Sequence, residues 1–178
     1  CRQDGAKIGG ARSGYLFNST IAGIDDADAL LIIGSNPRIE APVLNARIRR
    51  AWLAKQMPVG TIGENADLTY ETQWLGDEAS LIDDVLSGKN KFAAKLKKAK
   101  RPMIIIGMGA LVRPDGASVL GKVRQIAETY GVVTDEWNGF NILHNAAARV
   151  AGLDIGFLPN RGGMDIAAMA SAAKAGSL

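Results

Sequence analysis

The sequence has a single cysteine, Cys1, at its first position. A disulfide within the chain needs two cysteines, and an iron–sulfur cluster takes about four protein ligands, mostly thiolates. These residues alone therefore build neither. No activating neighbours surround Cys1, so we interpret it as incidental rather than nucleophilic. Low cysteine content also fits a reducing compartment.

Long apolar runs are missing as well. No stretch approaches the ~20 apolar residues that a membrane-spanning helix requires, and the first residues are not followed by the apolar region of a signal peptide. The net charge is only +3, from 21 basic and 18 acidic side chains. The densest basic run, 95–101, is expected at a helix end, where positive charge suits the helix dipole. Nucleic-acid binding is therefore not predicted.

Motifs for hydrolytic or metal chemistry are also absent: the sequence has no P-loop, no G-x-S-x-G and no H-x-x-x-H. His144 is the only histidine. It is expected on a helix and interpreted as structural, because it lacks partner ligands at useful spacing. The acidic cluster of Asp25, Asp26 and Asp28 is interpreted as a solvated helix start rather than as a metal site. No catalytic and no metal-binding residue is predicted.

Apolar residues make up 47% of the chain and charged residues 22%, which is typical of a globular protein. Two continuous apolar runs, 29–34 and 103–107, end in glycine and are each followed by an amphipathic segment. Continuous apolar character indicates strands buried on both faces, as in a parallel sheet. Further strands are expected at 59–63 and 132–134. The sequence therefore predicts an α/β fold, a Rossmann-like parallel sheet flanked by helices.

Helices are predicted between these strands. The first begins near Ile39, with Glu40 and Pro42 in its first turn, where a carboxylate and a proline are both favourable. Its buried stripe recurs at three- and four-residue spacing and consists of Val43, Leu44, Ile48, Ala51 and Trp52. Asp77 is expected to cap a later helix. The helices expected after the first strand cover 39–53, 77–87, 91–100, 117–130, 141–152 and 165–175, and a short turn or helix is expected before it, at 19–24.

Domain organisation follows from the absence of a linker. No stretch is long and polar enough to separate two domains, so we predict a single α/β domain over 1–178, with 1–14 irregular. The chain has no initiator methionine, and its last expected helix leads to no further strand. We therefore expect a fragment of a longer subunit.

The turn after the first strand is the best candidate for a binding site. Gly34, Ser35 and Asn36 stand at the carboxyl end of that strand, where open parallel sheets bind ligands. A glycine lets the backbone approach a phosphate, and the two polar side chains offer hydrogen bonds. The pattern is not G-x-G-x-x-G, however, and Gly34 is also explained as a turn residue. Gly107-Met108-Gly109 is a weaker instance of the same pattern. These residues alone leave open a live phosphate site and an empty turn.

Several segments are similar to one protein family. The longest are YLFNSTIAGI at 15–24, ADALLIIGSNPR at 27–38 and EAPVLNARIR at 40–49, with shorter matches at 67–70, 75–77 and 141–144. They resemble the large iron–sulfur subunits of respiratory complex I, the NADH-quinone oxidoreductase of bacteria. The strand–glycine parts are shared with all molybdopterin oxidoreductases, such as formate dehydrogenase and DMSO reductase. The resemblance covers nearly the whole chain.

The resemblance implies a role for the whole subunit in carrying electrons from NADH toward quinone. Its 2Fe–2S and 4Fe–4S clusters are expected outside this chain, which corresponds to a molybdopterin-oxidoreductase-like part that serves as a scaffold without a cofactor. Molybdenum enzymes often have a histidine before the Pro-Val pair, where this sequence has Ala41 before Pro42-Val43. That departure weakens the case for a bound pterin. Gly34, Ser35 and Asn36 are then interpreted as a vestigial phosphate-type turn.

The partners implied are the other subunits of the complex I peripheral arm and the rest of the chain's own polypeptide, with no nucleic acid and no direct membrane span. The implied location is peripheral, on the cytoplasmic face of the bacterial inner membrane or on the mitochondrial matrix side. Two other hypotheses stay open: a live cofactor-binding domain of a molybdopterin-dependent oxidoreductase, and a free-standing nucleotide-binding domain.

Overall fold

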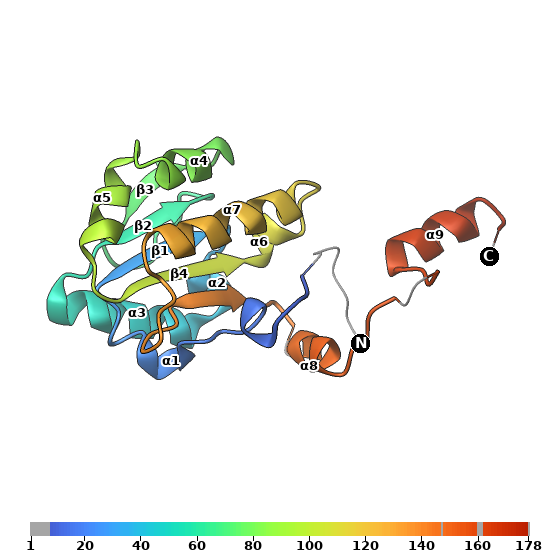
Figure 1. The fold of residues 1–178 in the computed structure, drawn as a ribbon, viewed down its shortest axis with the longest axis horizontal. Coiled ribbons are helices and arrows are strands. Elements are labelled where there is room, and N and C mark those ends of the chain that lie inside the picture. The colour runs from blue at the N-terminus through green and yellow to red at the C-terminus, as the bar shows by residue number, and fades with distance from the viewer. Residues whose placement is uncertain (1–7, 147, 160–161, 178) are drawn as a thin grey trace.

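A computed structural model describes residues 8–146, 148–159 and 162–177 around a central parallel sheet (Figure 1). The sheet has five strands in the order β3-β2-β1-β4-β5. They are β1 (Ala29–Ile33), β2 (Val59–Ile62), β3 (Gln73–Gly76), β4 (Pro102–Gly107) and β5 (Phe140–Leu143). All neighbours pair in parallel. The predicted Rossmann-like α/β fold is confirmed, and the strand order reverses between β1 and β4.

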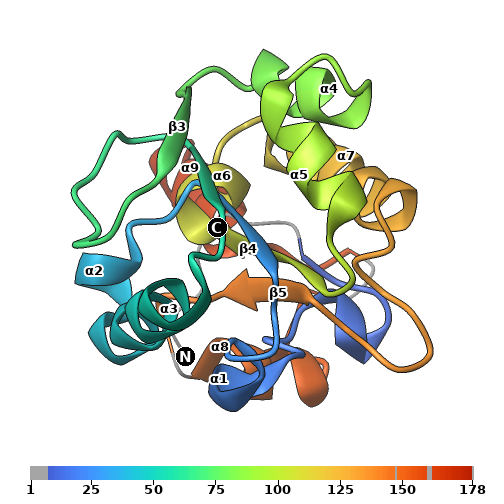
Figure 2. The same cartoon turned by 90° about the vertical axis from the view of Figure 1, so that its left-hand side faces the viewer.

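Helices cover both faces of this sheet (Figure 2). One face carries α4 (Ser80–Leu86), α5 (Lys91–Lys98) and α7 (Gly116–Thr129), and the other carries α1 (Thr20–Gly23) and α3 (Pro42–Lys55). The remaining helices are η1 (Arg12–Gly14, a 3-10 turn), α2 (Pro37–Glu40), α6 (Met108–Leu111), α8 (Ala148–Asp154) and α9 (Ile166–Lys174).

The side chains of β1 divide the core into two clusters. Leu31 and Ile33 pack with the side chains of α4, α5 and α7, whereas Leu30 and Ile32 pack with those of α3. All five residues of β1 are buried, as expected for a central parallel strand covered on both faces. Each buried Leu or Ile contributes about 1.5–3 kcal/mol, so the two apolar runs recognised in the sequence contribute strongly to the stability of the fold.

The helix predicted from Ile39 is in fact two helices that are separated at Ala41. Ala41 has φ −150° and ψ 71°, because the ring of the following proline disfavours the helical region for the residue before it. The buried face of α3 consists of Leu44, Asn45, Ile48 and Ala51. Val43 lies outside this face and is 74% exposed, so its predicted burial was wrong.

The strand predicted at 132–134 was also wrong, and the helix predicted at 141–152 is confirmed only in its last part, where α8 begins at Ala148. Residues 140–143 form β5, which pairs with β4 on one side, while the Ile142 backbone N–H donates to Leu16 O on the other. Val133 makes only an isolated bridge with Asn138. A short apolar run is ambiguous between strand and helix when its neighbours in space are unknown.

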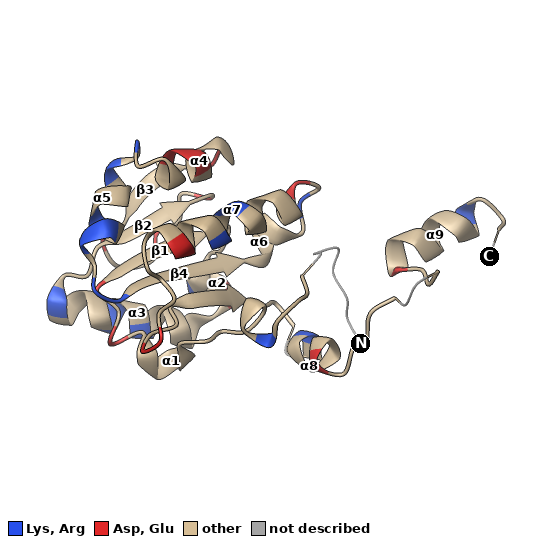
Figure 3. Cartoon of the chain, in the orientation of Figure 1, with Lys and Arg blue, Asp and Glu red and all other residues tan. Residues whose placement is uncertain are grey.

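One further expectation about local structure was wrong, and one strand was not predicted. Asp77 caps no helix, since α4 begins at Ser80 without a side-chain cap. The unpredicted strand is the edge strand β3, which contains Trp74 and carries no long apolar run. In contrast, the basic run 95–101 lies at the carboxyl end of α5 as predicted (Figure 3).

The acidic cluster follows α1 instead of starting a helix. The Asp28 carboxylate accepts the backbone N–H groups of Lys100 and Arg101 at 2.7 and 2.8 Å. Asp25 forms ion pairs with Arg47, at 2.8 Å, and with Arg50. These aspartates join the loop before β1 to α3 and to the start of β4. Within the described ranges, no group of His, Cys, Asp and Glu side chains is arranged to hold a metal ion.

The carboxyl-terminal helix α9 lies apart from the sheet (Figure 1). It forms where predicted, with the Asp165 side chain accepting the Ala168 N–H at its start, but it buries none of its residues. The extent of a single domain over 1–178 stays a prediction. Cys1 and the first half of the expected irregular segment lie outside the described residues. In the part of the chain that the structure covers, no helix has the length and apolar character needed to cross a bilayer.

Candidate functional site

The segments that follow β1 and β4 meet where the strand order reverses. Ile33, the last residue of β1, lies beside Ile106 of β4, so these segments leave the sheet side by side. Gly34, Ser35 and Asn36 form the turn after β1, and Gly109 lies in α6, which follows β4 directly. The structure thus places the predicted turn at the ligand-binding edge of a doubly wound sheet.

Three glycines, at the end of β4, in α6 and in the turn after β1, allow these segments to pack backbone against backbone. Gly34 has φ +60°, and a Cβ there would lie 2.5 Å from the backbone nitrogen of Ala110. A Cβ on Gly107 would lie 2.5 Å from Gly34 O, and a Cβ on Gly109 would lie 2.7 Å from the same oxygen. No real side chain tolerates such contacts without backbone movement. The packing of the chain on itself therefore explains these glycines.

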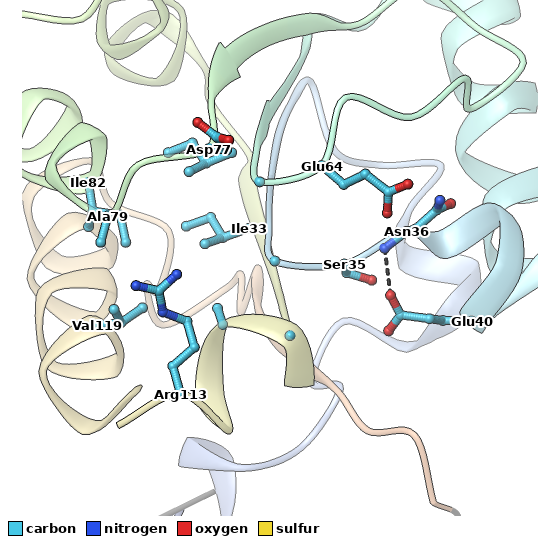
Figure 4. A pocket seen from close by; sticks show the side chains of 15 residues that line it. Ile33, Ser35, Asn36, Glu40, Glu64, Asp77, Ala79, Ile82, Arg113 and Val119 are labelled. Carbon is cyan, nitrogen blue, oxygen red and sulfur yellow. Dashed lines mark hydrogen bonds between the residues drawn. The ribbon is translucent and has the colours of Figure 1, made fainter. Parts of the chain in front are cut away.

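A cleft of about 450 Å³ opens beside this contact (Figure 4). Its apolar wall is formed by β1, β2, α4 and α7 through the side chains of Ile33, Ile62, Ile82 and Val119. Its charged rim consists of Glu40, Glu64, Asp77 and Arg113. The cleft therefore combines an apolar interior with a rim that carries more acidic than basic groups.

The Glu40 carboxylate accepts the backbone N–H of Asn36 at 2.5 Å (Figure 4). This amide precedes the single turn of α2, where backbone N–H groups have no partner within the helix. Such an amide is a group that would meet a phosphate at a strand–turn–helix junction. In this chain its partner is a carboxylate from the same turn.

The one basic side chain on the rim is held by a neighbouring carboxylate. Arg113 donates to both oxygens of Asp115, at 2.8 and 3.1 Å. This pairing raises the pKa of the Arg113 guanidinium and lowers the pKa of the Asp115 carboxyl. The carboxylates of Glu40, Glu64 and Asp77 form no ion pair with any described residue. The rim is therefore electronegative.

Glu64 and Asp77 are site residues that the sequence reasoning missed. Gly63-Glu64 follows β2, and Asp77 follows Gly76 at the end of β3. Both carboxylates share a sequence pattern that could have indicated them: a strand ends in or is followed by a glycine, and the next residue is the acidic one. Sequence alone did not show that β2 and β3 lie in one sheet with β1.

His144 lies away from the cleft. It is in the loop after β5 rather than on a helix as predicted, and its Nε2 is 2.7 Å from Tyr15 O. It lines a separate apolar groove of about 480 Å³ together with Phe17, Ile21 and Val43. The His144 ring thus links the loop after β5 to the segment before α1. This contact agrees with the interpretation of His144 as a structural residue.

Comparisons with known proteins give both a family and relatives. The family model of molybdopterin oxidoreductases matches residues 1–176. The chain is 47% identical over 146 residues to the G subunit of NADH-quinone oxidoreductase from Rickettsia bellii (82% of this chain, 21% of that protein). It is 47% identical over 146 residues to the same subunit of Rickettsia conorii (82% and 22%). It therefore spans about a fifth of the length of these curated relatives.

The cleft does not fit the dinucleotide form of the pterin cofactor that this family implies. A pterin dinucleotide carries several negative charges and needs free N–H donors or cationic side chains. Here the Asn36 N–H donates to Glu40, and the Arg113 guanidinium donates to Asp115. In addition, three carboxylates line the rim. Like charges repel such a ligand, and we derive no reaction step through it.

Proposed function

The chain belongs to the molybdopterin oxidoreductase family, and we propose that it is a cofactor-free structural module of the large iron–sulfur subunit of NADH-quinone oxidoreductase. The observation that carries this proposal is the hydrogen bond from the Asn36 N–H to the Glu40 carboxylate. The Glu40 carboxylate, which belongs to the chain itself, accepts the hydrogen bond that the Asn36 N–H would otherwise donate to a cofactor phosphate. The vestigial nature of Gly34, Ser35 and Asn36 is part of the same proposal.

The role of the whole subunit is proposed from its relatives, which are named as G subunits of NADH-quinone oxidoreductase. We propose that the complete protein passes electrons from NADH toward quinone through 2Fe–2S and 4Fe–4S clusters bound outside this chain. Cys1 alone supplies far too few thiolates for such a cluster. The proposed partners are the rest of the same polypeptide and other subunits of the peripheral arm. The proposed location is peripheral, at the cytoplasmic face of the inner membrane or the matrix side of its mitochondrial counterpart.

Packing at the sheet edge supports a structural rather than a ligand-binding use of the turn. The close approach of Gly107 and Gly109 to the Gly34 oxygen leaves no room for a side chain at these positions, so the glycines serve the packing of the chain on itself at the edge where doubly wound sheets bind ligands.

Titration of the chain with AMP, NADH and a pterin dinucleotide tests this proposal. We expect no saturable heat in isothermal titration calorimetry, which corresponds to dissociation constants above about 1 mM. A phosphate-bearing ligand that binds more tightly, and shifts the amide resonances of Ser35 and Asn36, contradicts it.

A live cofactor-binding domain of a molybdopterin-dependent oxidoreductase is the second candidate. It is favoured by the family match and by a cleft at the reversal of strand order. This candidate requires molybdenum or tungsten to copurify with the full-length protein. Elemental analysis that finds iron alone excludes it.

A further inference from the structure

The carboxyl-terminal helix α9 differs from the other long helices of the described chain. Every other helix of seven or more residues in the described ranges, from α3 to α8, buries side chains against its neighbours. The nine residues of α9 bury none, and the helix projects away from a sheet whose two faces already carry helices (Figure 1). The described chain therefore covers no face of α9.

The residue pattern of α9 is nevertheless that of a helix that packs against a neighbour. Its apolar face repeats at spacings of three and four residues and consists of Ile166, Met169, Ala170 and Ala173. Ile166 is 56% exposed and Met169 is 48% exposed. Ser171 lies on the opposite side of the helix. The apolar face carries no charged side chain, so water is a poor neighbour for it.

The length of α9 leads independently to the same requirement. Helices shorter than about 12–15 residues are only marginally stable in water when nothing packs against them. The Asp165 carboxylate accepts the Ala168 N–H at 2.7 Å and so caps the first turn, but a cap does not replace packing. A stable α9 therefore needs an apolar surface that covers Ile166 and Met169.

The apolar face of α9 continues into a shallow hollow of about 310 Å³. Ile166 and Met169 line this hollow together with Leu158 and Met164 from the preceding segment. Leu158 and Met164 are each 46% exposed. A contiguous exposed apolar surface of this kind marks a site of interaction with another protein surface.

We propose that the apolar face of α9 docks on another part of the same polypeptide, outside these 178 residues. The curated relatives have the length for such a part, since the matched residues make up only 21% and 22% of them. A surface on the same polypeptide meets α9 at a high effective concentration. An uncharged, apolar face is also typical of permanent contacts rather than of transient ones. The inference rests on the proposed function, because it assigns to α9 one contact that holds the module in the complete subunit.

The test compares hydrogen exchange of the α9 amides in the complete subunit and in the 178-residue chain, followed by mass spectrometry of peptic peptides. A helix that nothing covers protects its amides only weakly. We therefore expect α9 to exchange about 100-fold or more slowly in the complete subunit than in the chain.

Two variants of the complete subunit identify the face that is covered. Met169→Glu places a charge on the apolar face and should accelerate exchange of α9 about tenfold or more. Ser171→Glu is the matched control, because it places the same charge in the same helix on the opposite side, and it should change exchange by less than about threefold. Peptides from β1 and β4 should keep their protection in both variants, which verifies that the sheet remains folded.

Equally fast exchange of α9 in the complete subunit and in the chain overturns the proposal, as do equal effects of the two variants. Strong protection in the dilute chain overturns it in favour of the chain's own apolar groove beside α1 and α3, and protection that rises with chain concentration overturns it in favour of a second copy. The ligand titration described above tests the proposed function separately. An exposed α9 without ligand binding contradicts only this inference, whereas AMP binding contradicts the cofactor-free function whatever the exchange of α9.

Discussion

Asn36 and Glu40 lie at the two ends of one helical turn, and the backbone N–H of the first donates to the carboxylate of the second at 2.5 Å. This hydrogen bond spans the single turn of α2, which lies at the edge of the sheet where a Rossmann-like fold binds ligands. The same carboxylate therefore has two consequences, one for stability and one for the sign of the local charge.

Replacing Glu40 should first destabilise the chain. Glu40→Ala removes the acceptor of the Asn36 N–H, and we expect a loss of about 1 kcal/mol in the free energy of unfolding, as for other helix caps. Urea denaturation measures it. Glu71→Ala, at an exposed side chain without a partner among the described residues, should stay within about 0.5 kcal/mol of the parent. Equal losses in the two variants would show that the bond contributes nothing.

The close approach at Gly34 should make that position intolerant of alanine. Gly34 and Gly131 have similar φ values, +60° and +64°, but a Cβ on Gly34 meets Ala110 at 2.5 Å whereas a Cβ on Gly131 meets nothing within 4 Å. Gly131→Ala therefore measures the backbone strain alone, about 1 kcal/mol. Gly34→Ala adds overpacking, and we expect it to cost about 1–3 kcal/mol more. Similar midpoints of urea unfolding for the two variants contradict the packing contact.

A buried polar pair should make stability depend on alkaline pH. Tyr70 Oη donates to Asn45 Oδ1 at 2.9 Å, and burial raises the pKa of the Tyr70 hydroxyl. The unfolded chain loses this proton near pH 10, and the folded chain only at higher pH. The stabilisation is therefore complete below about pH 10 and declines as pH rises above it.

The variant Tyr70→Phe tests this relationship. It leaves Asn45 Oδ1 without its donor, and we expect it to lose about 1–3 kcal/mol at neutral pH. Its unfolding midpoint should also fall less than that of the parent between pH 9 and 11. Tyr130→Phe is a control on a less buried hydroxyl, whose pKa burial also raises. A parent and a Tyr70→Phe variant with parallel pH curves would contradict the assignment.

The loop before β1 should depend on Asp28 and not on its neighbour Asp26. Asp28 accepts two backbone N–H groups at 2.7 and 2.8 Å, whereas Asp26 makes one contact of 3.8 Å to Arg101. We expect Asp28→Ala to cost about 1 kcal/mol and Asp26→Ala to stay within about 0.5 kcal/mol. Thermal unfolding of the two variants side by side measures the difference. A larger loss from Asp26→Ala would overturn this interpretation of the acidic cluster.

The parts of the fold that were predictable are those governed by local composition. The continuous apolar residues of β1 and β4, the glycine that ends each apolar run and the amphipathic pattern of α7 are readable along the chain, and all three appear as expected. The segment around Asn141 was not readable in this way. Its side chain accepts from the Ser19 backbone, 122 residues away in sequence, at 2.9 Å, and such a partner has no local signature.

The candidate site shows the same division. The turn of Gly34, Ser35 and Asn36 was predicted, because a buried strand followed by glycine marks the carboxyl edge of a sheet. The carboxylates of Glu64 and Asp77 were not associated with it. They reach the turn only because β2 and β3 continue outward from β1 in one parallel sheet.

The amino-acid sequence by itself determined the buried strands, their alternation with helices and the similarity to one family, since each depends on which residues follow one another. Only the tertiary structure decided what charge surrounds the turn. The field at a cleft is the sum over side chains close in space, and here the charged side chains follow four different strands, β1 to β4, which lie side by side only in the folded sheet.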